Sequence, residues 1–169
     1  MNRIFDMVEL ANVLTPRGGR MTQRGWREDR IVLCCGCFDL LHLGHVKHLE
    51  AAKALGDVLV VLVTPDRFVN KGPGRPVFNE NDRTEMLAAL RCVDYVAINK
   101  WPNAVEAIKL LCPDIYCKGG EYKEVIPPLV NEKEAIEAVG GKLIFTDTPQ
   151  THTTDILERL NADLALHQR

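Results

Sequence analysis

The amino-acid sequence predicts an α/β protein built on a doubly wound, parallel, five-stranded sheet with helices on both faces. Short apolar runs alternate with longer amphipathic stretches about five times along the 169 residues. The run at 58–63 is a continuous series of Val and Leu, typical of a strand buried on both faces of a parallel sheet. Repeated strand–helix–strand units connect by right-handed crossovers, which keep the strands parallel and place helices on both sides.

Five apolar runs of strand length predict the sheet. In chain order they are 31–35, 58–63, 95–98, 115–118 and 142–146. In parallel sheets of this kind, ligands bind beyond the carboxyl ends of the strands, near the point where the strand order reverses. The segments that follow the strands should therefore contain the polar and glycine residues of a ligand site, and these segments are rich in such residues.

Amphipathic stretches after these strands predict the helices. They are 46–55, 80–90, 104–111, 131–139 and 153–160. In the first helix we expect Val46, Leu49, Ala52 and Ala54 to face the core.

Capping and stop signals bound several of these helices. Asn79 is a predicted N-cap. Pro113 stops the helix before it, and Gly140 with Gly141 forms a C-cap signature. Because these signals flank the amphipathic stretches, they support the predicted boundaries.

The first thirty residues differ from the repeating pattern. Residues 6–14 are expected to form one helix, and 15–30 is basic, contains Gly and is expected to be irregular. We therefore predict an N-terminal arm over 1–30 and a single domain over 31–169, a length that can bury a real core.

Charge and hydropathy exclude several classes of partner. The net charge is −2 at pH 7, so no global basic field attracts nucleic acid or a membrane surface. No stretch approaches the roughly 20 apolar residues that span a bilayer, and the start lacks an apolar signal core. We expect a cytoplasmic protein that binds a small ligand at a local site.

Six cysteines raise the question of redox or metal chemistry. Cys34 and Cys37 have C-x-x-C spacing, but no second ligand pair of matching spacing follows. Most of the cysteines lie in apolar runs, where reduced Cys behaves as a small hydrophobe. We predict buried structural thiols, with a redox or zinc protein that uses Cys34, Cys35 and Cys37 as the weaker alternative.

The segment 36–45 holds the richest group of candidate functional residues. It reads G-C-F-D-L-L-H-L-G-H and leads from the first strand into the first helix. A helix start offers free N–H groups and partial positive charge to a phosphate. Gly44 removes a side chain where a phosphate must approach the backbone. His42 and His45 can then donate hydrogen bonds to phosphoryl oxygens in the transition state.

This segment resembles the signature of the cytidylyltransferase-like nucleotidyltransferases, and the resemblance extends over about 31–160. Later segments resemble the adenylyltransferase half of bifunctional ADP-heptose synthases, namely 71–77, 81–83, 92–96 and 113–122. The resemblance implies a Rossmann-like fold. The sugar kinase half of those enzymes has no counterpart here, so a stand-alone transferase is expected.

The resemblance implies a set of site residues. His42, His45 and Lys71 are the expected catalytic residues. The expected nucleotide-binding residues are Gly36, Cys37, Phe38, Asp39, Gly44, Arg83, Lys118, Gly119, Gly120, Glu121, Thr153 and Thr154. No metal ligand is expected from the protein. His152 stands where the family commonly has Ser, which leaves the role of that position open.

Elementary chemistry supports several of these roles. Lys71 lies on a loop from which a flexible cation can reach a triphosphate, and Arg75 is a weaker candidate of the same kind. Arg83 can fork onto phosphate oxygens in a way that Lys cannot. Gly119 and Gly120 permit a flat base or ribose to approach the backbone, and Thr153 and Thr154 precede a helix start that can bind an anion.

The implied reaction transfers a nucleoside monophosphate, by resemblance AMP from ATP, to a sugar 1-phosphate such as heptose 1-phosphate. An NDP-sugar forms and pyrophosphate leaves. The attacking phosphate is already anionic, so catalysis is mainly positioning and charge neutralisation. Mg²⁺ is the expected cofactor, carried by the triphosphate. A homodimer is expected by resemblance.

Two alternatives stay open at this point. A CTP-dependent cytidylyltransferase that acts on glycerol 3-phosphate or another polyol or sugar phosphate would use the same motif, because loops read the base and the acceptor. A nucleotide-binding sensor that has lost catalysis gains some support from His152 and Leu43, which depart from common family residues.

Overall fold

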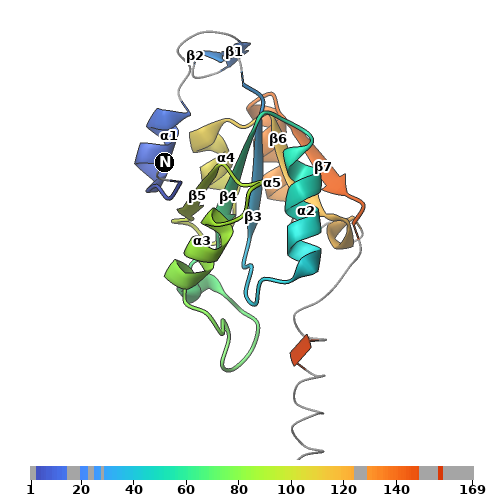
Figure 1. Cartoon of the computed structure of the whole chain (residues 1–169). Helices are drawn as coiled ribbons and strands as arrows, with labels where there is room; N and C mark the ends of the chain where they lie inside the picture. The colour runs from blue at the N-terminus through green and yellow to red at the C-terminus, as the bar shows by residue number, and fades with distance from the viewer. Residues whose placement is uncertain are drawn as a thin grey trace, which may run out of the picture.

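The computed structural model describes residues 3–14, 20–22, 25–27, 29–123, 129–148 and 156–157. Figure 1 shows the arrangement, with one sheet at its centre. The five strands of that sheet, in spatial order, are β5 (Tyr95–Ile98), β4 (Val58–Val63), β3 (Ile31–Gly36), β6 (Ile115–Gly119) and β7 (Lys142–Thr146). Every neighbouring pair is parallel. The predicted Rossmann-like α/β fold is confirmed.

Strand order reverses next to β3. From β3 the chain crosses to β4 and then β5 on one side, and it returns to β6 and then β7 on the other. The carboxyl ends of β3 and β6 therefore flank a topological switch point, where open α/β sheets bind ligands.

Helices cover both faces of the sheet. On one face, α2 (Leu43–Lys53) and α3 (Glu80–Ala88) bury Leu49, Ala52 and Leu87 against inward-facing strand residues. The opposite face is covered by α1 (Met7–Val13), α4 (Val105–Leu111) and α5 (Val130–Ala138). The two apolar layers hold the strand ends, and with them the loops, in fixed positions.

The first helix after β3 differs from the prediction at both ends. It begins at Leu43 rather than 46 and ends at Lys53, with Ala54 as its C-cap. Leu49 and Ala52 are buried as predicted, but Ala54 is exposed because it lies past the last helical turn. The earlier start places His45 within the first turn.

The N-terminal helix packs on the same core. Asp6 caps α1 by accepting hydrogen bonds from two backbone amides, and the Glu9 carboxylate accepts one from the Asp6 amide. Met7 and Leu10 are buried in the cluster beneath α4. Ile4 also forms a parallel bridge with Val96, so this segment covers the edge of β5.

The segment at 15–30 and the helix predicted over 153–160 are described only in part. Residues 20–22 and 25–27 form a short antiparallel pair, β1 (Arg20–Thr22) and β2 (Gly25–Arg27), where an irregular segment was expected. Of the helix predicted over 153–160, only 156 and 157 lie within the described residues, and both are helical.

No described helix is long and apolar enough to cross a membrane.

Candidate active site

The loop after β3 delivers two imidazoles to the start of α2. Phe38 and Leu40 in this loop have positive φ angles of 51° and 52°. His42 is the N-cap of α2, has an extended backbone and makes no side-chain cap hydrogen bond. The His42 side chain therefore does not cap the first amide groups of α2, and these groups give the helix start a partial positive charge.

The two predicted catalytic histidines lie against each other. The rings of His42 and His45 are stacked with centroids 3.8 Å apart and an interplanar angle of 26°. Phe38 meets His45 edge-on at 5.4 Å. A Cβ atom on Gly36 would lie 3.1 Å from the Phe38 ring, so glycine leaves room for that ring. In this structure Gly36 and Phe38 position His45.

His45 is neutral over the physiological range. Burial lowers the pKa of His45 to about 3, and the charges of His42 and Lys71 act in the same direction, while Asp39 opposes them. The Nδ1 atom of His45 is buried and has no hydrogen-bond partner among the described residues. A buried nitrogen of this kind is costly unless a ligand satisfies it.

Lys71 lies close to this pair. It is exposed on the loop between β4 and α3, and its charge lowers the pKa of both His45 and Cys37. For Cys37, burial is the larger effect and raises the thiol pKa overall. The structure therefore brings the three predicted catalytic residues within electrostatic reach of one another.

Asp39 anchors a neighbouring loop. Its side chain is fully buried. One carboxylate oxygen accepts a hydrogen bond from Arg75 Nε at 2.6 Å, and the other accepts from the amides of Val77 and Phe78 at 2.9 Å and 3.2 Å. Burial raises the pKa of Asp39, but the Arg75 guanidinium and the two amides outweigh it, so the pKa lies below its ordinary value.

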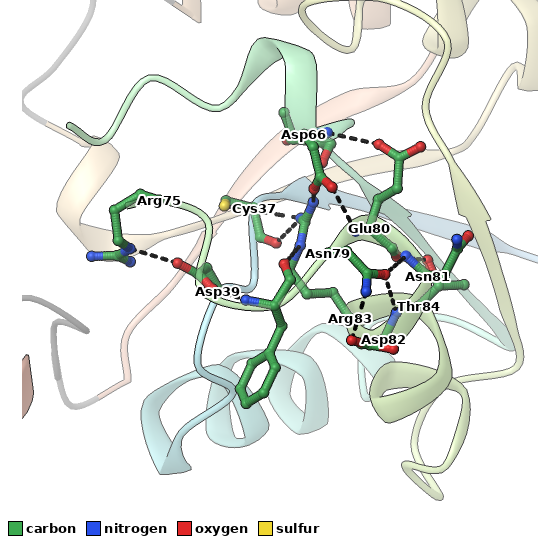
Figure 2. Close-up of polar contacts among 12 residues, drawn as sticks. Cys37, Asp39, Asp66, Arg75, Asn79, Glu80, Asn81, Asp82, Arg83 and Thr84 are labelled. Carbon is green, nitrogen blue, oxygen red and sulfur yellow. Dashed lines mark hydrogen bonds and ion pairs between the residues drawn. The ribbon is translucent and has the colours of Figure 1, made fainter. Parts of the chain in front are cut away.

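Arg83 connects the loop after β3 with the loop between β4 and α3, and Figure 2 shows its contacts with Cys37 and Asp66. The side chain is completely buried in α3. It donates hydrogen bonds to the carbonyl oxygens of Cys37, Thr64 and Phe78 and forms an ion pair with Asp66. The resemblance implied a phosphate contact for Arg83, but these partners make it a clamp between the loops after β3 and β4 and the start of α3.

Two acidic residues, Asp66 and Glu80, fix the start of α3 by bonding to each other's backbone. Glu80 Oε2 accepts from the Asp66 amide at 2.7 Å, and Asp66 Oδ2 accepts from the Glu80 amide at 3.1 Å. Asn79 caps α3 as predicted. Sequence reasoning missed Asp66 and Glu80, although both stand beside the ends of regular elements, where polar side chains often bond to the backbone.

The segment after β6 is packed more tightly by protein than the sequence suggested. A Cβ atom on Gly119 would lie 2.1 Å from the Glu121 carboxylate, and one on Gly120 would lie 2.8 Å from the Thr146 carbonyl oxygen. Lys118 donates to the Cys35 carbonyl oxygen at 3.2 Å. The two glycines thus allow the end of β6 to approach its own loop and β7.

The Lys118 side chain lies between two aromatic rings. Its Nζ atom is 4.6 Å from the Tyr122 ring centroid and 5.5 Å from that of Tyr116. Aromatic faces attract cations at such separations. This arrangement fixes the Lys118 ammonium at the carboxyl end of β6.

The remaining predicted residues divide into two groups. Gly44 lies in the first turn of α2, inside the helix rather than before its predicted start at 46. Thr153 and Thr154, together with His152, lie outside the described residues. The second predicted helix start therefore stays a prediction.

The cysteines are thiols and form no metal site in the described part of the chain. All six cysteines are free thiols. Cys34 stands opposite Cys117 in the β3–β6 register, and the two thiols hydrogen-bond to each other. Within the described part of the chain, no group of three or more His, Cys, Asp or Glu side chains could hold a metal ion.

Comparison with known proteins adds three findings. The sequence matches the cytidylyltransferase-like family over residues 33–163. It is 42% identical over 137 residues to the bifunctional protein HldE of Syntrophotalea carbinolica, a match that covers 79% of this chain and 27% of that protein. It is 45% identical over 141 residues to the bifunctional protein HldE of Nitratiruptor sp., covering 80% and 29%. The chain thus spans less than a third of the length of these relatives.

Solved structures give the same picture. The lipopolysaccharide core biosynthesis protein from Thermoplasma volcanium superposes with a TM-score of 0.62 at 28% identity, covering 72% of this chain and 99% of that one. Pantoate-beta-alanine ligase from Francisella tularensis gives a TM-score of 0.60 at 14% identity, covering 89% of this chain and 69% of that one. The second likeness concerns the fold alone.

Proposed function

This chain belongs to the cytidylyltransferase-like family, and from that premise we propose that it transfers AMP from ATP to a sugar 1-phosphate such as heptose 1-phosphate. The products are an NDP-sugar and pyrophosphate. Similarity to proteins named bifunctional protein HldE, and to a protein named for lipopolysaccharide core biosynthesis, supports a sugar phosphate as the acceptor.

The stacked pair of His42 and His45 at the start of α2 carries the proposal. Their rings lie together at the start of α2, next to the switch point of the sheet, and the side chain of the N-cap residue His42 does not cap the helix. The buried Nδ1 atom of His45 would gain a partner from a phosphoryl oxygen. An unsatisfied buried group costs roughly 1–3 kcal/mol, so ligand binding removes a penalty that the free protein carries.

The chemistry needs little proton transfer. An oxygen of the acceptor phosphate attacks the α-phosphorus of the triphosphate, and the bond from that phosphorus to the bridging oxygen breaks. Pyrophosphate leaves with the electron pair. Negative charge of the bound triphosphate raises the pKa of His45 from its low value in the free protein, so both imidazoles can stabilise the transition state with Lys71.

Mg²⁺ enters this proposal only with the triphosphate, where it would neutralise phosphate charge. The carboxylates nearest the site loops do not fit as its ligands, because Asp39 is paired with Arg75 and Asp66 with Arg83. The proposed step therefore requires no protein carboxylate on the metal. A cytoplasmic location, a homodimer and an arm over 1–30 ahead of a transferase domain over 31–169 stay predictions.

A substrate panel tests the function. The purified chain is incubated with Mg²⁺, each of ATP, CTP, GTP and UTP, and each of heptose 1-phosphate, hexose 1-phosphates and glycerol 3-phosphate, and pyrophosphate release is measured. We expect the highest kcat/KM with ATP and a sugar 1-phosphate, with the NDP-sugar identified by mass. A preference for CTP with glycerol 3-phosphate would assign the cytidylyltransferase alternative. Triphosphate binding without pyrophosphate release from any pair would assign the sensor.

A further inference from the structure

A third histidine on α2 has no part in the mechanism above. His48 follows His45 by three residues, so both side chains lie on the same side of the helix. The Nδ1 atom of His48 is 2.8 Å from the hydroxyl oxygen of Thr146, the last residue of β7. Thr146 stands opposite Gly119 in the β6–β7 register. His48 therefore joins the phosphate-binding helix to the carboxyl ends of β6 and β7.

The hydrogen bonds of Thr146 favour one tautomer of His48. The Thr146 hydroxyl donates to the Lys118 carbonyl oxygen at 3.4 Å. A hydroxyl has one proton, so when that proton is given to Lys118 the hydroxyl oxygen is left to accept from Nδ1 of His48. In a neutral imidazole protonated at Nδ1, the other nitrogen, Nε2, is a hydrogen-bond acceptor.

The ring is neutral at physiological pH. Burial lowers the pKa of His48 below its ordinary value; the Glu121 carboxylate opposes this effect and the Lys118 ammonium adds to it. On the same helix, His45 is the neighbouring titratable group, and its pKa is also lowered. Next to a helix start that attracts anions, His48 thus offers a lone pair and no charge. Such a group suits a neutral donor such as a hydroxyl.

We propose that His48 is a specificity-determining residue, whose Nε2 accepts a hydrogen bond from a hydroxyl of the phosphorylated acceptor. This inference rests on the proposed function. His48 lies three residues, or roughly 4.5 Å of helix rise, beyond His45. That spacing matches the separation of a phosphate from a hydroxyl two carbons away on a sugar phosphate. An acceptor whose phosphate reaches the start of α2 would therefore bring such a hydroxyl to His48.

Two substitutions separate the contact with substrate from the bond to Thr146. In His48→Asn the amide nitrogen can take the place of Nδ1 and keep the Thr146 bond, but nothing replaces Nε2. In His48→Gln the longer side chain brings its amide to the place of Nε2 and loses the Thr146 bond. Lys47→Ala is the matched control, because Lys47 is exposed and pairs with the surface residue Glu50.

The experiment measures KM for ATP and for the best sugar 1-phosphate of the panel. We expect His48→Asn to raise the acceptor KM about tenfold, the effect of one lost hydrogen bond, with the KM for ATP within about twofold of wild type. His48→Gln should recover part of the loss, and Lys47→Ala should change neither constant. A deoxy acceptor that lacks the hydroxyl should weaken wild type but not His48→Asn.

Several outcomes would overturn the inference. An unchanged acceptor KM in His48→Asn would remove the contact, and an equal rise in the two KM values would assign His48 to scaffold positioning. A rise confined to ATP would mean that Nε2 reads the amino group of the base. If wild type releases no pyrophosphate with any pair, the proposed function itself fails, which is a separate result from any of these.

Discussion

The Nε atom of Arg75 lies 2.6 Å from Oδ2 of Asp39, and the two side chains are 10% and 0% exposed. The same carboxylate accepts hydrogen bonds from two backbone amides of the loop between β4 and α3. That loop carries Lys71, while Asp39 belongs to the loop that carries His42. One ion pair therefore sets where the exposed lysine stands relative to the imidazoles.

Replacing Asp39 with Asn should destabilise the protein. The substitution leaves the Arg75 guanidinium buried without a counter-charge, and breaking a buried pair costs about 3 kcal/mol. Urea unfolding at neutral pH measures the change. Glu50→Gln is the control, since Glu50 is half exposed in its pair with Lys47 and should cost less than about 1 kcal/mol. Similar losses in the two variants would contradict the anchoring role of Asp39.

Arg83→Lys should disturb the loops rather than phosphate binding alone. Lysine keeps the charge but cannot fork between the carbonyl oxygens of Cys37, Thr64 and Phe78. We expect a loss of about 2 kcal/mol or more in unfolding free energy, because buried acceptors lose their donor. Thermal unfolding and triphosphate binding are measured together. Normal stability with weakened triphosphate binding would instead support the phosphate contact that the resemblance implied.

Most of the fold was readable from local pattern. The runs at 58–63, 95–98 and 142–146 were predicted to the residue, because polar residues or glycine stand on both sides of each apolar run. The start of α2 was placed three residues late, since Gly44 interrupts the apolar periodicity there. The bridge between Ile4 and Val96 was not predictable, because it joins residues far apart in sequence.

The candidate site was only partly predictable for the same reason. His42 and His45 belong to one short motif at the start of one helix, so their proximity follows from their short separation along the chain. Arg83 and Cys37 are 46 residues apart, and Arg75 and Asp39 are 36 apart. A sequence shows that such residues are charged, but their pairing depends on which strand ends meet in the folded sheet. Residues assigned to ligand on local grounds, such as Asp39, therefore proved to have protein partners as well.

His45→Ala should impair the chemical step. If His45 stabilises charge on the migrating phosphoryl group, its loss should lower kcat by a factor of roughly 10² or more. The KM for ATP should change much less, because the stabilisation is greatest in the transition state. Steady-state pyrophosphate release measures both constants. A near-normal kcat would remove His45 from the mechanism.

The low pKa of His45 predicts a pH dependence of stability. The pKa falls from 6.5 to about 3 on folding, so between these values the unfolded chain binds a proton that the folded chain does not. Stability should therefore decrease as the pH drops below about 6.5, by at most about 1.4 kcal/mol per pH unit.

His45→Gln isolates that contribution, because His48 also has a lowered pKa and acts with the same sign. Urea unfolding between about pH 5 and about pH 8 should give a flatter profile for the variant than for wild type. Identical slopes would show that the imidazole of His45 titrates normally in the folded protein.

Glu132 supports the opposite face of the sheet and gives a test of the buried core. It is 6% exposed on α5 and accepts hydrogen bonds from the Ala104 amide and the Tyr116 hydroxyl, both at 2.9 Å. Ala104 is the N-cap of α4 and has no side chain that could cap it. The Glu132 carboxylate on α5 accepts the hydrogen bond of the Ala104 amide instead. Glu132→Gln should cost about 1–3 kcal/mol, because an amide group then faces one of two buried donors.

A double-mutant cycle with Tyr116→Phe tests this explanation. Removing the Tyr116 hydroxyl allows the Gln amide oxygen to accept from the Ala104 amide while its nitrogen faces the vacated position. The double variant should therefore lose less stability than the sum of the two single variants, by about 1 kcal/mol in urea unfolding. Strictly additive losses would mean that the two bonds are independent and that Glu132 contributes mainly through packing on α5.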